Sequence, residues 1–147
     1  MKLDLVIFGA TGFTGNLGTK YVDTMYADSG LKWGIAGRNR EKLELLQAQC
    51  DERNRPEVLV ADGNDISALE NMCKRTKVIA TCAGPFGRYG RALVAACVRQ
   101  GTDCTCFCAL VFLLFFLLQV LFSNVLFVRD IQQKTVISLA KLILSAR

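Results

Sequence analysis

The sequence predicts an α/β fold: a Rossmann-type alternation of strands and helices in a doubly wound parallel sheet, incomplete at its end and followed by a hydrophobic helix. Short apolar runs of strand length alternate with stretches of helical spacing as far as about residue 103. Three glycines spaced three residues apart, Gly9, Gly12 and Gly15, come directly after the first apolar run. A stretch of 23 residues without a charge, residues 106–128, follows the alternating part.

Composition limits the class of protein before any motif is considered. The chain has 147 residues, enough for one domain. Its net charge is +5, and its basic residues are scattered among acidic ones. This pattern does not favour nucleic acid as a partner, because nucleic acid requires a clustered basic face. Seven irregularly spaced cysteines and an N-terminus without a secretory signal favour a reducing, intracellular compartment. The complete lack of histidine excludes histidine general bases and most catalytic zinc sites.

The first strand is expected over residues 3–8, and the glycines that follow it form a turn into a helix over residues 16–28. A dinucleotide brings its pyrophosphate very close to the backbone, where a Cβ atom would obstruct it. The helix that follows would direct its unpaired N–H groups at the phosphates. Gly15 could also serve only to let the helix pack closely on the strand, a role compatible with binding. Ser29-Gly30 is expected to end this helix.

The later elements follow the same alternation, so we expect parallel strands joined by right-handed crossovers in the order 3-2-1-4. A fifth strand should begin near Asp103. The other expected elements are strands at residues 31–36, 58–61 and 78–82, a helix capped by Asn39 that ends at Arg55-Pro56, a helix at 66–74 preceded by the polar turn 62–65, and a helix at 89–100.

The end of the second strand suggests which dinucleotide is bound. An NAD site usually has an acidic residue there, which accepts hydrogen bonds from the ribose 2′-hydroxyl. This chain has Gly37-Arg38-Asn39-Arg40 instead, and a guanidinium group suits a 2′-phosphate. NADP is therefore favoured over NAD, with Arg38 the better candidate than Arg40. The alternative is that both arginines are solvated loop charges.

Two further loops are expected on the same edge of the sheet. Asp62 follows the third strand, where it could reach the adenine edge or simply be an ordinary turn aspartate. Cys82 to Pro85, which include the candidates Ala83 and Gly84, follow the fourth strand, on the edge where ligands bind in open α/β sheets. Gly84 would let the ribose or phosphates approach, whereas Pro85 and Phe86 could instead stiffen and anchor the loop.

No catalytic residue can be assigned from the sequence. Cys104, Cys106 and Cys108 alternate and would align three thiols on a strand, but without histidine we interpret them as apolar residues rather than as a metal site. The Tyr-x-x-x-Lys pair of short-chain reductases is also absent.

Four motifs in order resemble the N-terminal domain of saccharopine dehydrogenase-like oxidoreductases, over about residues 3–103. They are Phe8-Gly-Ala-Thr-Gly-Phe-Thr-Gly15, Ala36-Gly-Arg-Asn-Arg-Glu-Lys-Leu43, Cys82-Ala-Gly-Pro-Phe86 with Tyr89-Gly90, and Ala95-Ala-Cys97 with Gly101-Thr-Asp103.

This resemblance implies a Rossmann fold that binds NADP through Gly9, Gly12, Gly15 and Arg38. It also implies a link to membranes and lipid droplets, with substrates that are poorly defined. Together with the arguments above, it gives one set of candidate cofactor-binding residues: Gly9, Thr11, Gly12, Phe13, Thr14, Gly15, Arg38, Asp62, Ala83 and Gly84.

After Asp103 the chain departs from the family pattern, so we divide it into a dinucleotide-binding domain (1–103), a hydrophobic segment (104–128) and a basic tail (129–147). The hydrophobic segment could be a transmembrane helix, a buried core segment or the product of a truncated gene. Three functions stay open: an NADP-dependent oxidoreductase fragment lacking its substrate domain and hence catalytically incomplete, a membrane-tethered NADP-binding module without catalysis, or a scaffold that has lost the ligand.

Overall fold

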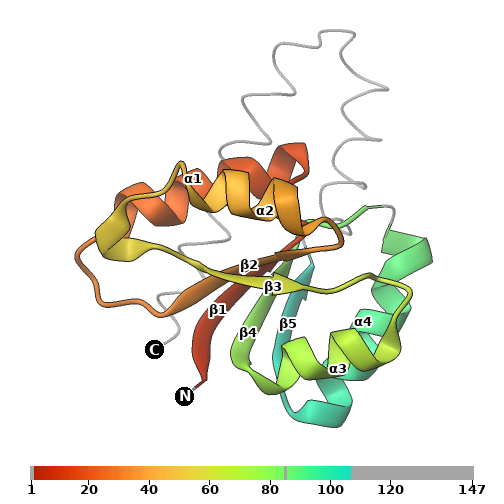
Figure 1. The fold of residues 1–147 in the computed structure, drawn as a ribbon. Helices are drawn as coiled ribbons and strands as arrows, with labels where there is room; N and C mark the ends of the chain where they lie inside the picture. The colour runs from red at the N-terminus through yellow and green to blue at the C-terminus, as the bar shows by residue number, and fades with distance from the viewer. Residues whose placement is uncertain (1, 85, 107–147) are drawn as a thin grey trace, which may run out of the picture.

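The computed structural model describes residues 2–84 and 86–106. These residues form a parallel sheet with helices on both faces (Figure 1). Within these residues the strand order is β3-β2-β1-β4-β5, and every neighbouring pair is parallel. The strands are β1 (Leu3–Phe8), β2 (Trp33–Gly37), β3 (Glu57–Val60), β4 (Thr76–Thr81) and β5 (Asp103–Cys106). The helices are α1 (Phe13–Met25), α2 (Arg40–Gln47), the 3₁₀ helix η1 (Glu52–Asn54), α3 (Ile66–Lys74) and α4 (Phe86–Gln100).

The predicted α/β class and the predicted order of the first four strands are confirmed, and the fifth strand begins at Asp103 as expected. The helix α3 also has the predicted bounds, because the carboxylate of Asp65 accepts a hydrogen bond from the backbone N–H of Ala68 and caps the helix. Asn39 caps α2 in the same way, accepting from the N–H of Lys42.

The predicted bounds of three helices are wrong. The first helix begins at Phe13 rather than residue 16 and ends at Met25, with Tyr26 rather than Ser29-Gly30 as its C-cap. Helix α2 ends at Gln47, well before Arg55-Pro56, because the Asp51 side chain accepts from the N–H of Arg53 and starts the separate helix η1. Helix α4 begins at Phe86, three residues before the predicted start.

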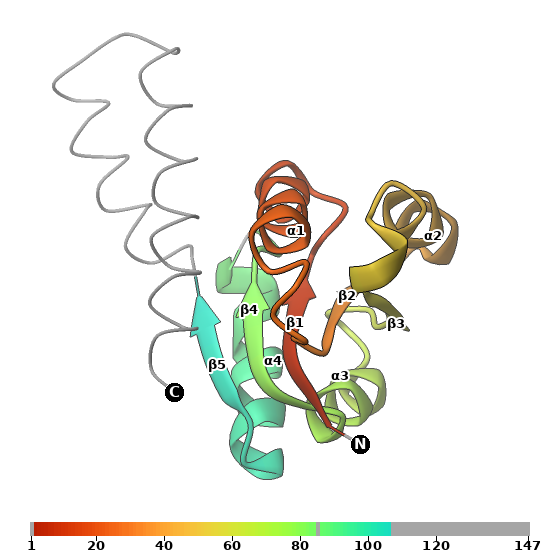
Figure 2. The same cartoon turned by 90° about the vertical axis from the view of Figure 1, so that its left-hand side faces the viewer.

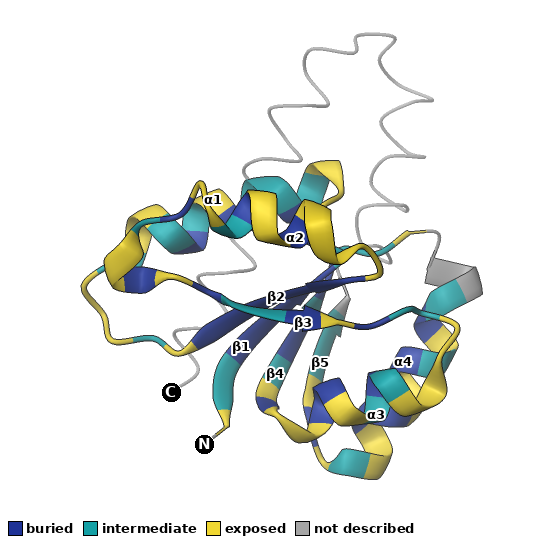
Figure 3. Cartoon of the chain, in the orientation of Figure 1, coloured by how far each residue is buried: buried dark blue, intermediate teal, exposed yellow. Residues whose placement is uncertain are grey.

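The central strand β1 is buried on both faces, as its apolar run requires. Leu5 and Ile7 pack with the cluster beneath α1 and α2, whereas Val6 and Phe8 pack with the cluster beneath α3 and α4. Figure 2 shows these two helical layers on either side of the sheet, and Figure 3 shows the buried strands between them. The sheet thus has a fixed carboxyl edge from which the connecting loops emerge.

The predicted hydrophobic helix lies almost wholly outside the described residues. The basic tail at 129–147 lies wholly outside them. Of the segment 106–128 only Cys106 is described, as the last residue of β5. Among residues 2–84 and 86–106, none of the helices has the length and apolar character that crossing a membrane requires.

Candidate functional site

The site begins where β1 ends, in a turn that requires glycine at its first position. Gly9 has a φ of +82°, and a Cβ atom there would lie 2.7 Å from the backbone nitrogen of Ala83. The N–H groups of Gly9 and Ala10 both donate to the carbonyl oxygen of Ala36, at 2.8 and 3.2 Å. The turn is therefore fixed against β2 on one side and against the loop after β4 on the other.

The other two glycines of the turn have different structural roles. The first N–H groups of any helix have no intrahelical partner. Gly12 is the N-cap of α1, and because it has no side chain it cannot accept hydrogen bonds from them. A Cβ atom on Gly15 would lie 2.2 Å from the carbonyl oxygen of Gly9. Gly15 thus lets α1 pack directly against the turn, which is the packing role considered for it in the sequence.

A cavity of about 300 Å³ lies at the carboxyl edge of the sheet, beside this turn. Its walls come from the ends of β1, β2, β3 and β4 and from the start of α4. Ligands of open α/β sheets bind at this place, outside the carboxyl ends of the strands. The lining residues are Phe8, Gly9, Thr11, Gly12, Gly37, Arg38, Ala61, Asp62, Gly63, Cys82, Ala83, Gly84 and Tyr89.

Seven of the ten candidate residues thus line one cavity: Gly9, Thr11, Gly12, Arg38, Asp62, Ala83 and Gly84. Phe13, Thr14 and Gly15 do not line it, because they form the first turn of α1, and Phe13 is 57% exposed.

The two arginines after β2 differ in their surroundings. Arg38 is exposed and lines the cavity, and it makes no ion pair with any residue that the structure describes. Arg40 lies in the first turn of α2 and contacts Glu44 at 3.3 Å, one helical turn further on. Arg38 is therefore the guanidinium group that faces the cavity.

Asp62 has a structural role in the loop after β3 as well as a place in the cavity wall. Its Oδ1 accepts hydrogen bonds from the backbone and side-chain nitrogens of Asn64, at 2.8 and 3.1 Å. Asp62 is thus the turn aspartate that the sequence allowed as an alternative, and it lines the cavity at the same time.

The loop after β4 forms the opposite wall. The backbone of Ala83 lies against Gly9, and the N–H of Ala83 donates to the Thr81 hydroxyl at 3.4 Å. A Cβ atom on Gly84 would meet no atom within 4 Å, so this glycine opens onto free space. The space leaves room for a ligand to approach the backbone at this point.

Six of the lining residues are not among the candidates predicted from the sequence. Phe8, Gly37 and Ala61 lie at or next to the carboxyl ends of strands, so the same rule that pointed to Asp62 and Ala83 would have found them. Cys82 was expected on this edge of the sheet but was not chosen as a candidate. Gly63 and Tyr89 could not have been found this way. The ring of Tyr89 lies 3.0 Å from where a Cβ atom on Gly63 would be, a contact between distant parts of the chain.

The described cysteines form no metal centre. Within residues 2–84 and 86–106 there is no group of three metal-ligating side chains that could hold an ion. Of the three alternating cysteines, Cys108 and the side chain of Cys106 are outside the description, and Cys104 packs against the core beneath α3 and α4.

Comparison with known proteins gives a match over nearly the whole chain. The family model of the saccharopine dehydrogenase NADP binding domain matches residues 5–140, so the likeness continues well past residue 103, where the motifs had suggested that it ends.

Curated relatives align over a shorter part. The saccharopine dehydrogenase-like oxidoreductase of Mus musculus is 36% identical over 115 residues, which cover 71% of this chain and 27% of the relative. The trans-acting enoyl reductase of Mycobacterium leprae is 39% identical over 103 residues, 69% of this chain and 24% of the relative. The chain thus spans about a quarter of the length of these relatives.

Solved structures share the fold at low identity. Saccharopine dehydrogenase (L-Glu forming) from Saccharomyces cerevisiae has a TM-score of 0.57 at 19% identity, over 71% of this chain and 21% of that one. A short-chain dehydrogenase/reductase from Veillonella parvula, solved in complex with NADP, has a TM-score of 0.55 at 19% identity, over 72% and 47% of the two chains.

Proposed function

This chain belongs to the saccharopine dehydrogenase NADP-binding domain family, and we propose that the cavity at the carboxyl edge of its sheet holds the adenosine and pyrophosphate part of NADP. One observation carries this proposal. Two glycines of the β1–α1 turn, Gly9 and Gly12, line the same cavity as Arg38. A backbone without side chains and a guanidinium group are the two features that a phosphorylated dinucleotide needs.

The pyrophosphate lies over Gly9, Thr11 and Gly12 in this proposal, next to the start of α1. The first N–H groups of α1, which include those of Phe13 and Thr14, supply donors without an intrahelical partner. A side chain at Gly12 would occupy the space that the phosphates need, because Gly12 lines the cavity.

The 2′-phosphate of NADP pairs with Arg38. A planar guanidinium group binds phosphate through two parallel hydrogen bonds, whereas it offers no acceptor to the 2′-hydroxyl of NAD. Arg40 is a weaker candidate, since its guanidinium group is already in contact with Glu44. Arg38 is therefore the residue that selects NADP over NAD.

Asp62 and the loop after β4 complete the proposed site. Because Oδ1 of Asp62 is held by Asn64, its other carboxylate oxygen is the acceptor we assign to the adenine edge. Ala83 and Gly84 accommodate the ribose or phosphates on the opposite wall, where Gly84 leaves the backbone open.

Bound NADPH supplies a hydride, so the reaction class we propose for the complete protein is hydride transfer to an organic substrate. The relatives at 36% and 39% identity are named as an oxidoreductase and an enoyl reductase, which agrees with this class. No group among the described lining residues is assigned as a catalytic acid or base.

Calorimetric titration of the full chain with NADPH and with NADH tests the cofactor proposal. We expect NADPH to bind and NADH to bind at least about tenfold more weakly, since a charge-assisted hydrogen bond contributes about 1.5–3 kcal/mol. Equal affinity for the two would remove Arg38 from the phosphate site. Binding of neither would favour the scaffold that has lost its ligand.

A second proposal, that the chain is a membrane-tethered NADP-binding module without catalysis, is favoured by one feature of the sequence. The 23 uncharged residues 106–128 suffice for a helix across a hydrocarbon core of about 30 Å. Sedimentation of the full chain with phosphatidylcholine vesicles tests this proposal. Recovery of the protein in the pellet supports a tether, whereas a folded protein that stays in the supernatant contradicts it.

A further inference from the structure

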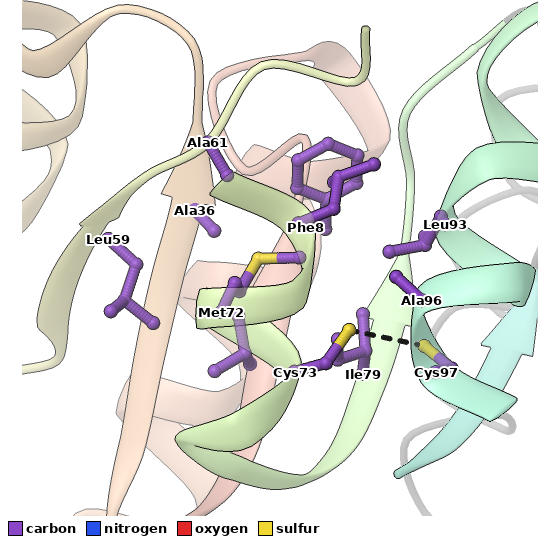
Figure 4. Packing of buried hydrophobic residues seen from close by; sticks show 12 residues of the cluster. Phe8, Ala36, Leu59, Ala61, Met72, Cys73, Ile79, Leu93, Ala96 and Cys97 are labelled. Carbon is purple, nitrogen blue, oxygen red and sulfur yellow. Dashed lines mark hydrogen bonds between the residues drawn. The ribbon is translucent and has the colours of Figure 1, made fainter. Parts of the chain in front are cut away.

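Two thiols from different helices meet in the core beneath α3 and α4, away from the dinucleotide cavity. Cys73, near the end of α3, and Cys97, near the end of α4, have their sulfur atoms 3.6 Å apart (Figure 4). Their exposed fractions are 0% and 2%. A disulfide bond is about 2.05 Å long, so the two atoms need to approach by only about 1.5 Å.

A single residue holds the backbones of both cysteines in place. The Thr102 hydroxyl donates to the carbonyl oxygen of Cys73 at 2.8 Å, and the Thr102 N–H donates to the carbonyl oxygen of Cys97 at 3.0 Å. Thr102 is itself buried. The ends of α3 and α4 are thereby fixed side by side, which keeps the two thiols in contact.

The two thiols also differ in acidity. The contact with the Cys97 thiol lowers the pKa of Cys73, because a hydrogen bond between the two sulfur atoms stabilises the Cys73 thiolate. A hydrogen bond with Cys104 acts to lower the pKa of Cys97, but the bond to Cys73 and burial outweigh it and raise that pKa to about 12. Cys73, the more acidic of the two thiols, is therefore the one we assign as the nucleophile.

We propose that Cys73 and Cys97 form a reversible disulfide that links α3 to α4 when a hydroperoxide oxidises the protein. The Cys73 thiolate attacks the terminal oxygen of the hydroperoxide and the O–O bond breaks, so that Cys73 becomes a sulfenic acid and the other oxygen leaves as an alkoxide or hydroxide that takes up a proton from water. The Cys97 sulfur then attacks the Cys73 sulfur, and the S–S bond forms as the sulfenic oxygen leaves with the Cys97 proton as water. The pair loses two electrons, the hydroperoxide gains them, and a thiol reductant restores both cysteines.

Both sulfur atoms are buried, but each cysteine lies near the end of its helix, next to an exposed residue. Lys74, the residue after Cys73, is exposed, and Val98, the residue after Cys97, is 76% exposed. We infer that a hydroperoxide reaches the pair through local opening of a helix end, where unfolding costs least. The pair lies near the carboxyl ends of the helices, whereas the cavity is at the carboxyl edge of the sheet, where α3 and α4 begin. The link is thus independent of the proposed cofactor site.

Peptide mapping of the full chain tests the proposal. The protein is treated with hydrogen peroxide, its remaining thiols are alkylated in denaturant, and it is digested with trypsin. Residues 54–74 contain Cys73 as their one cysteine, and residues 92–99 contain Cys97 as theirs. We expect these two peptides to be joined with the loss of two hydrogen atoms, and to separate after dithiothreitol.

Two variants test whether the linked peptide depends on Cys73. Cys73→Ser should remove the linked peptide, and Cys50→Ser is the matched control because Cys50 is also buried but belongs to the other core cluster. Alkylation of every cysteine in the treated wild-type protein would overturn the proposal. So would a link from Cys97 to the peptide that contains Cys104. The wild-type map decides the question even where a variant does not fold.

Discussion

Two hollows at opposite edges of the same sheet differ in what their walls offer a ligand. The hollow at the amino edge is the larger, at about 520 Å³ against about 300 Å³ for the cavity at the carboxyl edge. Many of its polar groups already have partners. The indole N–H of Trp33 donates to both oxygens of Asn54, and Arg53 pairs with Asp51 at 2.8 Å.

The cavity at the carboxyl edge is smaller, but its wall includes backbone and charge suited to a ligand. It is lined by glycines of the β1–α1 turn and by Arg38, which makes no ion pair within the described part of the chain. Volume alone therefore does not single out the hollow with the lining that suits a dinucleotide. The carboxyl-edge cavity is distinguished instead by a glycine backbone and by an arginine without an ion pair in the described part of the chain, two features that suit a phosphorylated ligand.

Gly15→Val should have the largest effect, and it tests whether the turn is held by packing. A Cβ atom at this position lies 2.2 Å from the Gly9 carbonyl oxygen and 2.6 Å from the Ala10 Cα atom. Since both are backbone atoms, α1 has to move away from the turn, at a cost of roughly 3 kcal/mol or more. Urea unfolding measures the loss.

Gly84→Ala is the matched control for stability. No atom lies within 4 Å of its Cβ position, so its free energy of unfolding should stay within about 0.5 kcal/mol of the wild type. A Gly15→Val protein as stable as the wild type would show that the turn is not packed as described.

Gly12→Val should abolish NADPH binding and leave the protein folded. Gly12 has φ −76° and ψ 169°, a conformation that valine adopts, and its Cβ atom would lie 3.3 Å from the Gly9 carbonyl oxygen. The valine methyl groups would instead fill the cavity that Gly12 lines. Calorimetry measures the affinity, and circular dichroism checks the fold. Retained affinity in a folded variant would refute the pyrophosphate position, and Gly12→Ala should give a partial loss.

Arg38→Asp should lower the affinity for NADPH roughly tenfold to a hundredfold and should change the affinity for NADH much less. The size follows from the loss of charge-assisted hydrogen bonds to the 2′-phosphate, which NADH lacks. Titration of both dinucleotides measures the change in their ratio.

Arg53→Asp is the matched control, because it reverses the same charge in the hollow at the amino edge. NADPH affinity should stay within about twofold of the wild type in this variant. Equal losses in the two variants would mean that net charge, and not the position of Arg38, governs binding.

The sequence predicted the lining of the cavity better than it predicted the ends of the helices. Gly9 and Arg38 were found because both follow strands, and parallel strands bring their carboxyl ends to one edge whatever the exact bounds of the elements. The end of α2 was predicted wrongly because a turn close by in the sequence competes with further helix. The side chain of Asp51 hydrogen-bonds to the N–H of Arg53 and starts η1, and such turns compete with helix extension in a way that apolar spacing does not reveal.

Contacts between distant parts of the chain were beyond reach of the sequence. Tyr89 lines the cavity because its ring packs on Gly63, and Cys73 meets Cys97 because Thr102 joins the ends of two helices. Neither pairing follows from spacing along one element. Each depends on how α3 and α4 pack together, which the alternation of strands and helices does not specify.

Trp33→Phe should have the smallest effect on binding, and it tests the other edge of the sheet. The change removes the indole N–H that donates to Asn54 at 2.8 and 3.0 Å and leaves a buried acceptor unsatisfied. Because Trp33 is only 3% exposed, we expect a loss of about 2 kcal/mol in the free energy of unfolding. NADPH affinity should stay within about twofold, since Trp33 lies at the amino end of β2 and the cavity at its carboxyl end. A tenfold loss of affinity in the folded variant would show that the two edges are coupled through β2, and the contrast between them would no longer hold.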